Sequence, residues 1–129
     1  EKYWNATFNG SPRYVNGDAT PWCGCFVNWC FKEAGQSNKL SGLGNKAYVP
    51  SYVNWAKNNG TWNSSPQPGD LIVFRWSSSS NGSHIGFVES VNGNTITTIE
   101  GNTGYSYHGE VKRNYFNKNS SYIYGFIHL

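Results

Sequence analysis

The residue pattern of this chain changes character near Asp70, and that change restricts the possible folds more than any other feature of the sequence. Before Asp70 the signals are those of helices, whereas after it short runs of β-type residues alternate with turn residues. The expected strands are Leu71 to Trp76, Ile85 to Val91, Thr95 to Glu100, Glu110 to Tyr115 and Tyr122 to Ile127. This order predicts an α+β fold, with N-terminal helices packed on a C-terminal antiparallel β-sheet.

Two helices are expected in the first half of the chain. Thr20 is a good N-cap, Pro21 suits the first helical position and Gly35 suits the C-terminal stop, so residues 20–35 are predicted to form the first helix. Pro50 to Asn58, closed by Asn59-Gly60, is predicted to form a second, shorter one. Residues 1–17 are expected to form an irregular arm.

Size and composition predict one folded domain over residues 1–129. A charged fraction of 13% and an aromatic fraction of 17% exclude intrinsic disorder. No apolar run approaches the roughly 18 residues of a membrane span, so no membrane insertion is expected. The chain has no Met and no apolar start, which predicts a processed chain or an excised domain.

The charge balance argues against nucleic acid as a partner. The net charge is +3, and the basic residues are scattered rather than gathered in a stripe. Mild basicity would still favour approach to an anionic polymer such as a bacterial cell wall.

The three cysteines lie within eight residues of one another, at Cys23, Cys25 and Cys30. On a helix Cys23 and Cys30 share a face but sit about 10 Å apart, too far for a disulfide. The spacing also lacks the ligand pairs of a zinc site, so we expect no metal and no cofactor. Cys25 is expected to be semi-buried and Cys30 to face the core.

Cys23 is the candidate nucleophile, because the first turn of a helix stabilises a thiolate. His84 is the favoured base, since it ends a polar loop and begins an apolar strand. His108 is expected to be exposed and His128 frayed. Glu100, at the end of the neighbouring strand, is the candidate acceptor that orients the imidazole.

The hairpin between these strands tests that assignment. A two-residue turn at Asn92-Gly93 would place His84 and Glu100 on opposite faces of the sheet. A three-residue loop, Asn92 to Asn94, would place Gly86 opposite Glu100 and His84 opposite Asn102, all on one face. Catalysis therefore predicts an odd loop or a bulge in this hairpin.

Four segments together carry a family resemblance. They are Pro21-Trp22-Cys23-Gly24-Cys25-Phe26-Val27-Asn28-Trp29, Pro68-Gly69-Asp70-Leu71-Ile72-Val73-Phe74, His84-Ile85-Gly86-Phe87-Val88 and Ile99-Glu100-Gly101-Asn102. In this order and spacing the chain resembles a CHAP domain, the cysteine, histidine-dependent amidohydrolase/peptidase module of phage endolysins and bacterial wall hydrolases. The resemblance implies a papain-like fold and catalytic roles for Cys23, His84, Glu100 and Asn102.

The same resemblance implies a hydrolase of amide or peptide bonds in bacterial peptidoglycan, working through a thioester. It would be secreted or released by a phage and would act at the cell wall, with or without a separate wall-binding domain or subunit. Some CHAP domains bind calcium through acids around the cysteine, but Asp18 is the only acid nearby.

Two other functions stay open at this point. One is a non-catalytic cell-wall or glycan-binding module whose cysteines merely pack. The other is an acyltransferase that uses the same residues. Trp22, Trp62 and Trp76 are candidates to line a substrate groove, with packing as the equal alternative for each. Asp70 is expected to be a turn acceptor.

Overall fold

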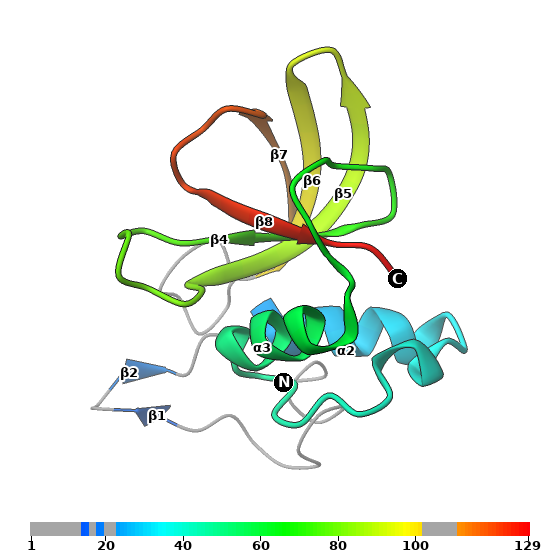
Figure 1. Cartoon of the computed structure of the whole chain (residues 1–129). Coiled ribbons are helices and arrows are strands. Elements are labelled where there is room, and N and C mark those ends of the chain that lie inside the picture. The colour runs from blue at the N-terminus through cyan, green and yellow to red at the C-terminus, as the bar shows by residue number, and fades with distance from the viewer. Residues whose placement is uncertain (1–13, 16–17, 20–22, 102–110) are drawn as a thin grey trace.

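The computed structural model describes residues 14–15, 18–19, 23–101 and 111–129. Within them, two α-helices and a short 3-10 helix lie on one side of a six-stranded antiparallel sheet (Figure 1). The helices are α2 (Cys23–Glu33), η1 (Ser37–Leu40) and α3 (Val49–Asn59). The expected α+β class is confirmed.

The strands follow the predicted runs closely. Their bounds are β3 (Trp62–Asn63), β4 (Leu71–Phe74), β5 (His84–Asn92), β6 (Thr95–Gly101), β7 (Val111–Asn117) and β8 (Ile123–Ile127), and their order in the sheet is β3-β8-β4-β5-β6-β7. A separate two-stranded sheet pairs β1 (Tyr14–Val15) with β2 (Asp18–Ala19). The expectation that residues 1–17 are wholly irregular is therefore wrong at β1.

The two helices end and pack as their sequences require. Gly35 and Gly60 have φ of 69° and 72°, the left-handed conformation that closes helices. In α3 the buried residues are Val49, Tyr52, Val53 and Ala56, a spacing that forms one helical face. That face joins the core between the helices and the sheet.

The sheet carries apolar side chains on both faces. Along β4, Leu71 and Val73 belong to the core beneath the helices, whereas Ile72 and Phe74 belong to a second cluster with Val88 of β5. This is the alternation of a strand covered on both sides. His84 pairs directly with Phe74, so its side chain lies on the face of the second cluster.

Two sequence expectations about the cysteines are wrong. Cys25 is completely buried rather than semi-buried, and Cys30 is half-buried rather than inside the core. Cys30 lines a cleft of about 490 Å³ between the second half of α2 and the chain end. Phe87 of β5 and the chain end, His128 and Leu129, also line this cleft, so Cys30 borders open space rather than the core. Burial still raises the pKa of the Cys30 thiol to about 11, so this thiol is poorly suited to act as a nucleophile.

His128 is held in place, contrary to the expected fraying. Its backbone N–H donates to the carbonyl oxygen of Thr61, and its Nδ1 lies 2.6 Å from Oδ1 of the buried Asp70. The other oxygen of Asp70 accepts from the backbone N–H of Gln67, as expected of a turn acceptor. Because β8 runs beside β4, the chain end is anchored to the turn that starts the central strand.

Candidate active site

Cys23 is the first residue of α2 and is buried at 2% exposure. The next residue packs closely against another segment, since a Cβ at Gly24 would lie 2.6 Å from the carbonyl oxygen of Lys46. The hydroxyl of Tyr52 lies 2.9 Å from the Gly24 carbonyl oxygen and 2.8 Å from that of Lys46. The start of α2 is thereby fixed to the segment that leads into α3.

His84 is the first residue of β5 and follows the serine-rich loop 77–83. Its ring is tilted against Phe74, with the ring centroids 5.8 Å apart, and stacked on Trp76, with the centroids 6.2 Å apart. Two aromatic rings therefore restrict the rotation of the imidazole. They leave it only 8% exposed.

A β-bulge sets the register between His84 and Glu100. The turn residues are Gly93 and Asn94, so Asn92 pairs with Thr95, and the register shifts by one residue between Val88 and Ser90. The two turns considered from the sequence, Asn92-Gly93 and Asn92 to Asn94, are therefore both wrong, whereas the predicted bulge is confirmed. Beyond the bulge Phe87 pairs with Ile99, which places Gly86 opposite Glu100 and puts His84 and Glu100 on one face.

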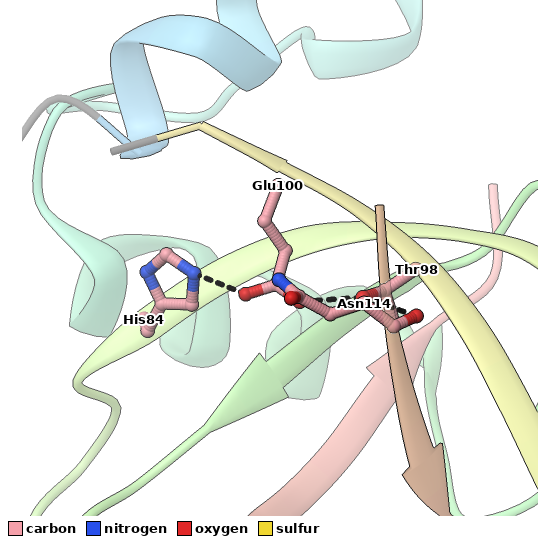
Figure 2. Close-up of polar contacts among 4 residues, drawn as sticks. All are labelled: His84, Thr98, Glu100 and Asn114. Atoms are coloured by element: carbon pink, nitrogen blue, oxygen red, sulfur yellow. Dashed lines mark hydrogen bonds and ion pairs between the residues drawn. The ribbon is translucent and has the colours of Figure 1, made fainter. Parts of the chain in front are cut away.

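The Glu100 carboxylate holds the imidazole. Its Oε1 lies 2.6 Å from Nε2 of His84 in a buried contact, while the other ring nitrogen points away from the carboxylate (Figure 2). Its Oε2 accepts hydrogen bonds from the Thr98 hydroxyl and from Nδ2 of Asn114, the latter at 3.1 Å. Each carboxylate oxygen therefore has its own partners.

The pKa values follow from these contacts. Burial alone would lower the pKa of His84, but hydrogen bonds with the Cys23 and Glu100 side chains, together with their negative charges, raise it to about 9. Burial would raise the pKa of Glu100, but hydrogen bonds with His84, Thr98 and Asn114 and the charge of His84 lower it. The contacts therefore favour a protonated imidazole beside an ionised Glu100 carboxylate.

Gly86 is required by this arrangement. A Cβ at this position would lie 2.6 Å from Cγ of Glu100 and 2.9 Å from the carbonyl oxygen of Ile99. We expect Gly86→Ala to displace the carboxylate from His84, to destabilise the fold by about 1–3 kcal/mol and to reduce turnover strongly. Gly44→Ala is the matched control, because Gly44 has open space around it and no positive φ. Thermal unfolding and catalytic rates measure these effects, and equal rates in the two variants would contradict this role of Gly86.

The structure brings four of the expected residues together, namely Cys23, His84, Glu100 and Trp76. Trp62 lies apart from them on β3, where its ring packs on Gly125 and Tyr124 and beneath the ammonium of Lys57. Trp22 and Asn102 fall outside the described residues, as do Thr20, Pro21 and His108.

Sequence reasoning missed Thr98 and Asn114. Thr98 lies two residues before Glu100 on the same strand, so alternation could have placed it on the same face. Asn114 could not be found this way, because its approach depends on the pairing of β6 with β7. Among the described residues no group of three or more His, Cys, Asp or Glu side chains is placed to hold a metal ion.

Comparison with known families and structures gives three findings. The family model described as "CHAP domain" matches residues 15–102, more than half of the chain. "The crystal structure of Ly7917" matches with 21% identity and a TM-score of 0.57 over 97% of this chain and 58% of that one. "The crystal structure of Ly7917 with the hydrolyzing product of MDP" matches with 22% identity and a TM-score of 0.59, over 97% and 59% of the two chains.

At this level of identity the likeness to Ly7917 shows the fold. This chain spans less than two thirds of the length of those solved chains. No curated protein matches the sequence.

Proposed function

This chain belongs to the CHAP domain family, and from that membership we propose that it hydrolyses an amide or peptide bond of bacterial peptidoglycan with Cys23 as the nucleophile. The observation that carries the proposal is the buried contact of 2.6 Å between His84 and Glu100, made by an imidazole whose pKa the Cys23 side chain also raises. A nucleophile, a base and an orienting carboxylate are the three parts that this chemistry needs. A wall-binding module would have no use for such an arrangement.

The first half-reaction forms a thioester. With the proton of the Cys23 thiol held on the His84 imidazole, the Cys23 thiolate attacks the carbonyl carbon of the scissile bond. The carbon–nitrogen bond then breaks, and the protonated imidazole gives its proton to the leaving amine. Glu100 stays ionised throughout and stabilises the imidazolium. The backbone N–H of Cys23, in the first turn of α2, is the proposed donor to the oxyanion.

The second half-reaction releases the acid. His84 removes a proton from water, the hydroxyl oxygen attacks the thioester carbonyl, and the carbon–sulfur bond breaks. The thiolate is left beside the imidazolium, ready for the next cycle. Asn102 is proposed to support the imidazole together with Glu100, as family membership implies.

An exposed aromatic ledge beside His84 is the proposed contact for substrate. Trp76 is 55% exposed, stacks on His84, and meets Tyr122, 52% exposed, edge to face with ring centroids 5.6 Å apart. Flat aromatic surfaces of this kind suit the apolar faces of sugars and of peptide stems. Trp62 is proposed as a further substrate contact, and so is Trp22, which lies outside the described residues.

The setting of the activity is also proposed. Residues 1–129 would form one catalytic domain of a phage endolysin or a bacterial wall hydrolase, acting at the cell wall after secretion or phage release. The solved relative was crystallised with the hydrolyzing product of MDP, a peptidoglycan fragment, which supports this substrate class. A separate wall-binding domain or subunit would suit a chain that spans only part of Ly7917. In the described residues no helix has the length and apolar character to cross a membrane.

Digestion of purified peptidoglycan, followed by mass spectrometry of the released fragments, tests the proposal. We expect new amino termini, and their identity names the bond. L-alanine at the new terminus indicates cleavage of the N-acetylmuramoyl-L-alanine amide, whereas other residues indicate a stem or cross-bridge bond. Wall binding without new termini, together with the absence of a fast-alkylating thiol, would replace the hydrolase with a binding module.

A further inference from the structure

We propose that Thr98 and Asn114 are positioning residues that hold the Glu100 carboxylate in the one orientation that serves His84. The inference rests on the proposed function and extends it to two side chains that touch neither the thiol nor the imidazole. Its basis is that the two oxygens of the Glu100 carboxylate have different partners: Oε1 contacts His84, whereas Oε2 accepts from Thr98 and Asn114 (Figure 2).

The terminal torsion of a glutamate is broad, so a carboxylate bound only through one oxygen can turn about its own axis. Here Oε1 meets Nε2 of His84, while Oε2 accepts from Thr98 on β6 and from Asn114 on β7. Two donors on Oε2 fix the plane of the carboxylate. Oε1 is then directed at the imidazole.

The register explains why these two residues reach the same oxygen. Thr98 precedes Glu100 by two residues and so shares its face of the sheet, and Asn114 is the direct partner of Thr98 across β6 and β7. Thr98 is completely buried and Glu100 almost so. The Thr98 hydroxyl has one proton and two acceptors within reach, Oε2 of Glu100 and the backbone carbonyl oxygen of Asn114, which lies 3.5 Å from Oγ1 of Thr98. The proton goes to the carboxylate, because an ionised oxygen is the stronger acceptor.

The same donors favour the ionised carboxylate in a buried place. Both Thr98 and Asn114 contribute to the lowered pKa of Glu100 against the opposing effect of burial. Within residues 23–101 and 111–129, the charged or titratable groups that face Glu100 are His84 on β5, Lys112, its direct partner on β7, and Cys23 through His84. Arg113, next along β7, pairs with Glu89 instead.

The test compares Thr98→Val with Thr97→Val. Valine keeps the shape of threonine and removes the donor, while Thr97 is the next residue of β6 and its side chain lies on the opposite face. We expect Thr98→Val to lower kcat about 10- to 100-fold with KM little changed. Thr97→Val should keep the parental values, and Thr98→Ser should restore most of the activity because it restores the hydroxyl.

A second readout separates positioning from mere support of the sheet. NMR titration of the His84 imidazole should show proton binding about 10-fold weaker in Thr98→Val, because its anionic partner is no longer held in place. The basic limb of the pH–rate profile should move to lower pH by about one pH unit, which corresponds to the 10-fold weaker proton binding. Asn114→Ala should act in the same direction, and it supplies the answer if Thr98→Val does not fold.

The NMR titration needs no substrate, so it also separates this inference from the proposed function. If the parental protein releases no peptidoglycan fragments, the hydrolase proposal fails, yet the shift at His84 still supports the positioning role. If Thr98→Val and Asn114→Ala fold and titrate like Thr97→Val, the positioning role is overturned even in an active hydrolase.

Discussion

Replacing Cys23 with alanine should abolish peptidoglycan cleavage, lowering turnover by about 10⁴-fold or more, because no other group can form the thioester. The fold should survive, since alanine keeps the helix start and removes one sulfur atom from the edge of the core. The measurements are the release of fragments from purified walls and the thermal unfolding midpoint. Binding to wall material should change little, because the aromatic ledge formed by Trp76 and Tyr122 is untouched.

Cys25→Ala is the matched control for that experiment. Cys25 lies two residues further along α2 and is completely buried, so its loss should cost stability while each folded molecule keeps its activity. Cys30→Ala should lower the free energy of unfolding less than Cys25→Ala does, because Cys30 is only half-buried. Activity that persists in Cys23→Ala and disappears in folded Cys25→Ala would identify the other thiol as the nucleophile.

Glu100→Gln should give the second large effect, a loss of turnover of about 10²- to 10⁴-fold with wall binding retained. The ionised carboxylate accepts the Nε2 proton of His84 and so leaves Nδ1 to serve the thiol. A glutamine amide can instead donate to Nε2, which favours the tautomer that cannot take the thiol proton. It also lacks the negative charge that helps to keep the pKa of His84 at about 9.

The pH dependence of that variant has a definite sign. In the parental protein His84 stays protonated until the pH rises through about 9. Without the carboxylate its pKa falls, so the basic limb of the residual activity should move to lower pH. Glu89→Gln is the control, because Glu89 is an exposed glutamate on β5 that pairs with Arg113 away from the site. Equal rates and equal pH profiles for the two variants would remove Glu100 from the mechanism.

Much of the fold could be predicted because local signals and tertiary packing agree. The left-handed Gly35 and Gly60 close the helices near the expected residues, and β4 to β8 occupy the predicted apolar runs. The candidate triad could also be predicted, since a first-turn cysteine and a strand-initial histidine are local features. The bulge was predicted from the needs of catalysis and not from a local sequence pattern, because only an odd loop or a bulge puts His84 and Glu100 on one face of the sheet.

What the sequence could not supply depends on contacts between distant residues. The edge strand β3 is two residues long and exists because Trp62 pairs with Ile127. His128 is ordered because it reaches Asp70, 58 positions earlier. Asn114 meets Glu100 only through the alignment of β6 and β7. Each of these is decided by the assembled sheet, so no short window of sequence could reveal it.

The bulge near Glu89 also divides the β5–β6 hairpin into two parts that differ in how much change of sequence length they can accept. Between the bulge and His84, the strand register cannot change, because Gly86 must lie opposite Glu100 for His84 and Glu100 to meet. On the other side, the pairing runs from Ser90 to a two-residue tip at Gly93 and Asn94, at the opposite end of β5 from His84. The tip is therefore the natural point for lengthening the hairpin or grafting a peptide. If the same residues paired from this tip without the bulge, Phe87 instead of Gly86 would lie opposite Glu100, and the histidine and the glutamate would lie on opposite sides of the sheet.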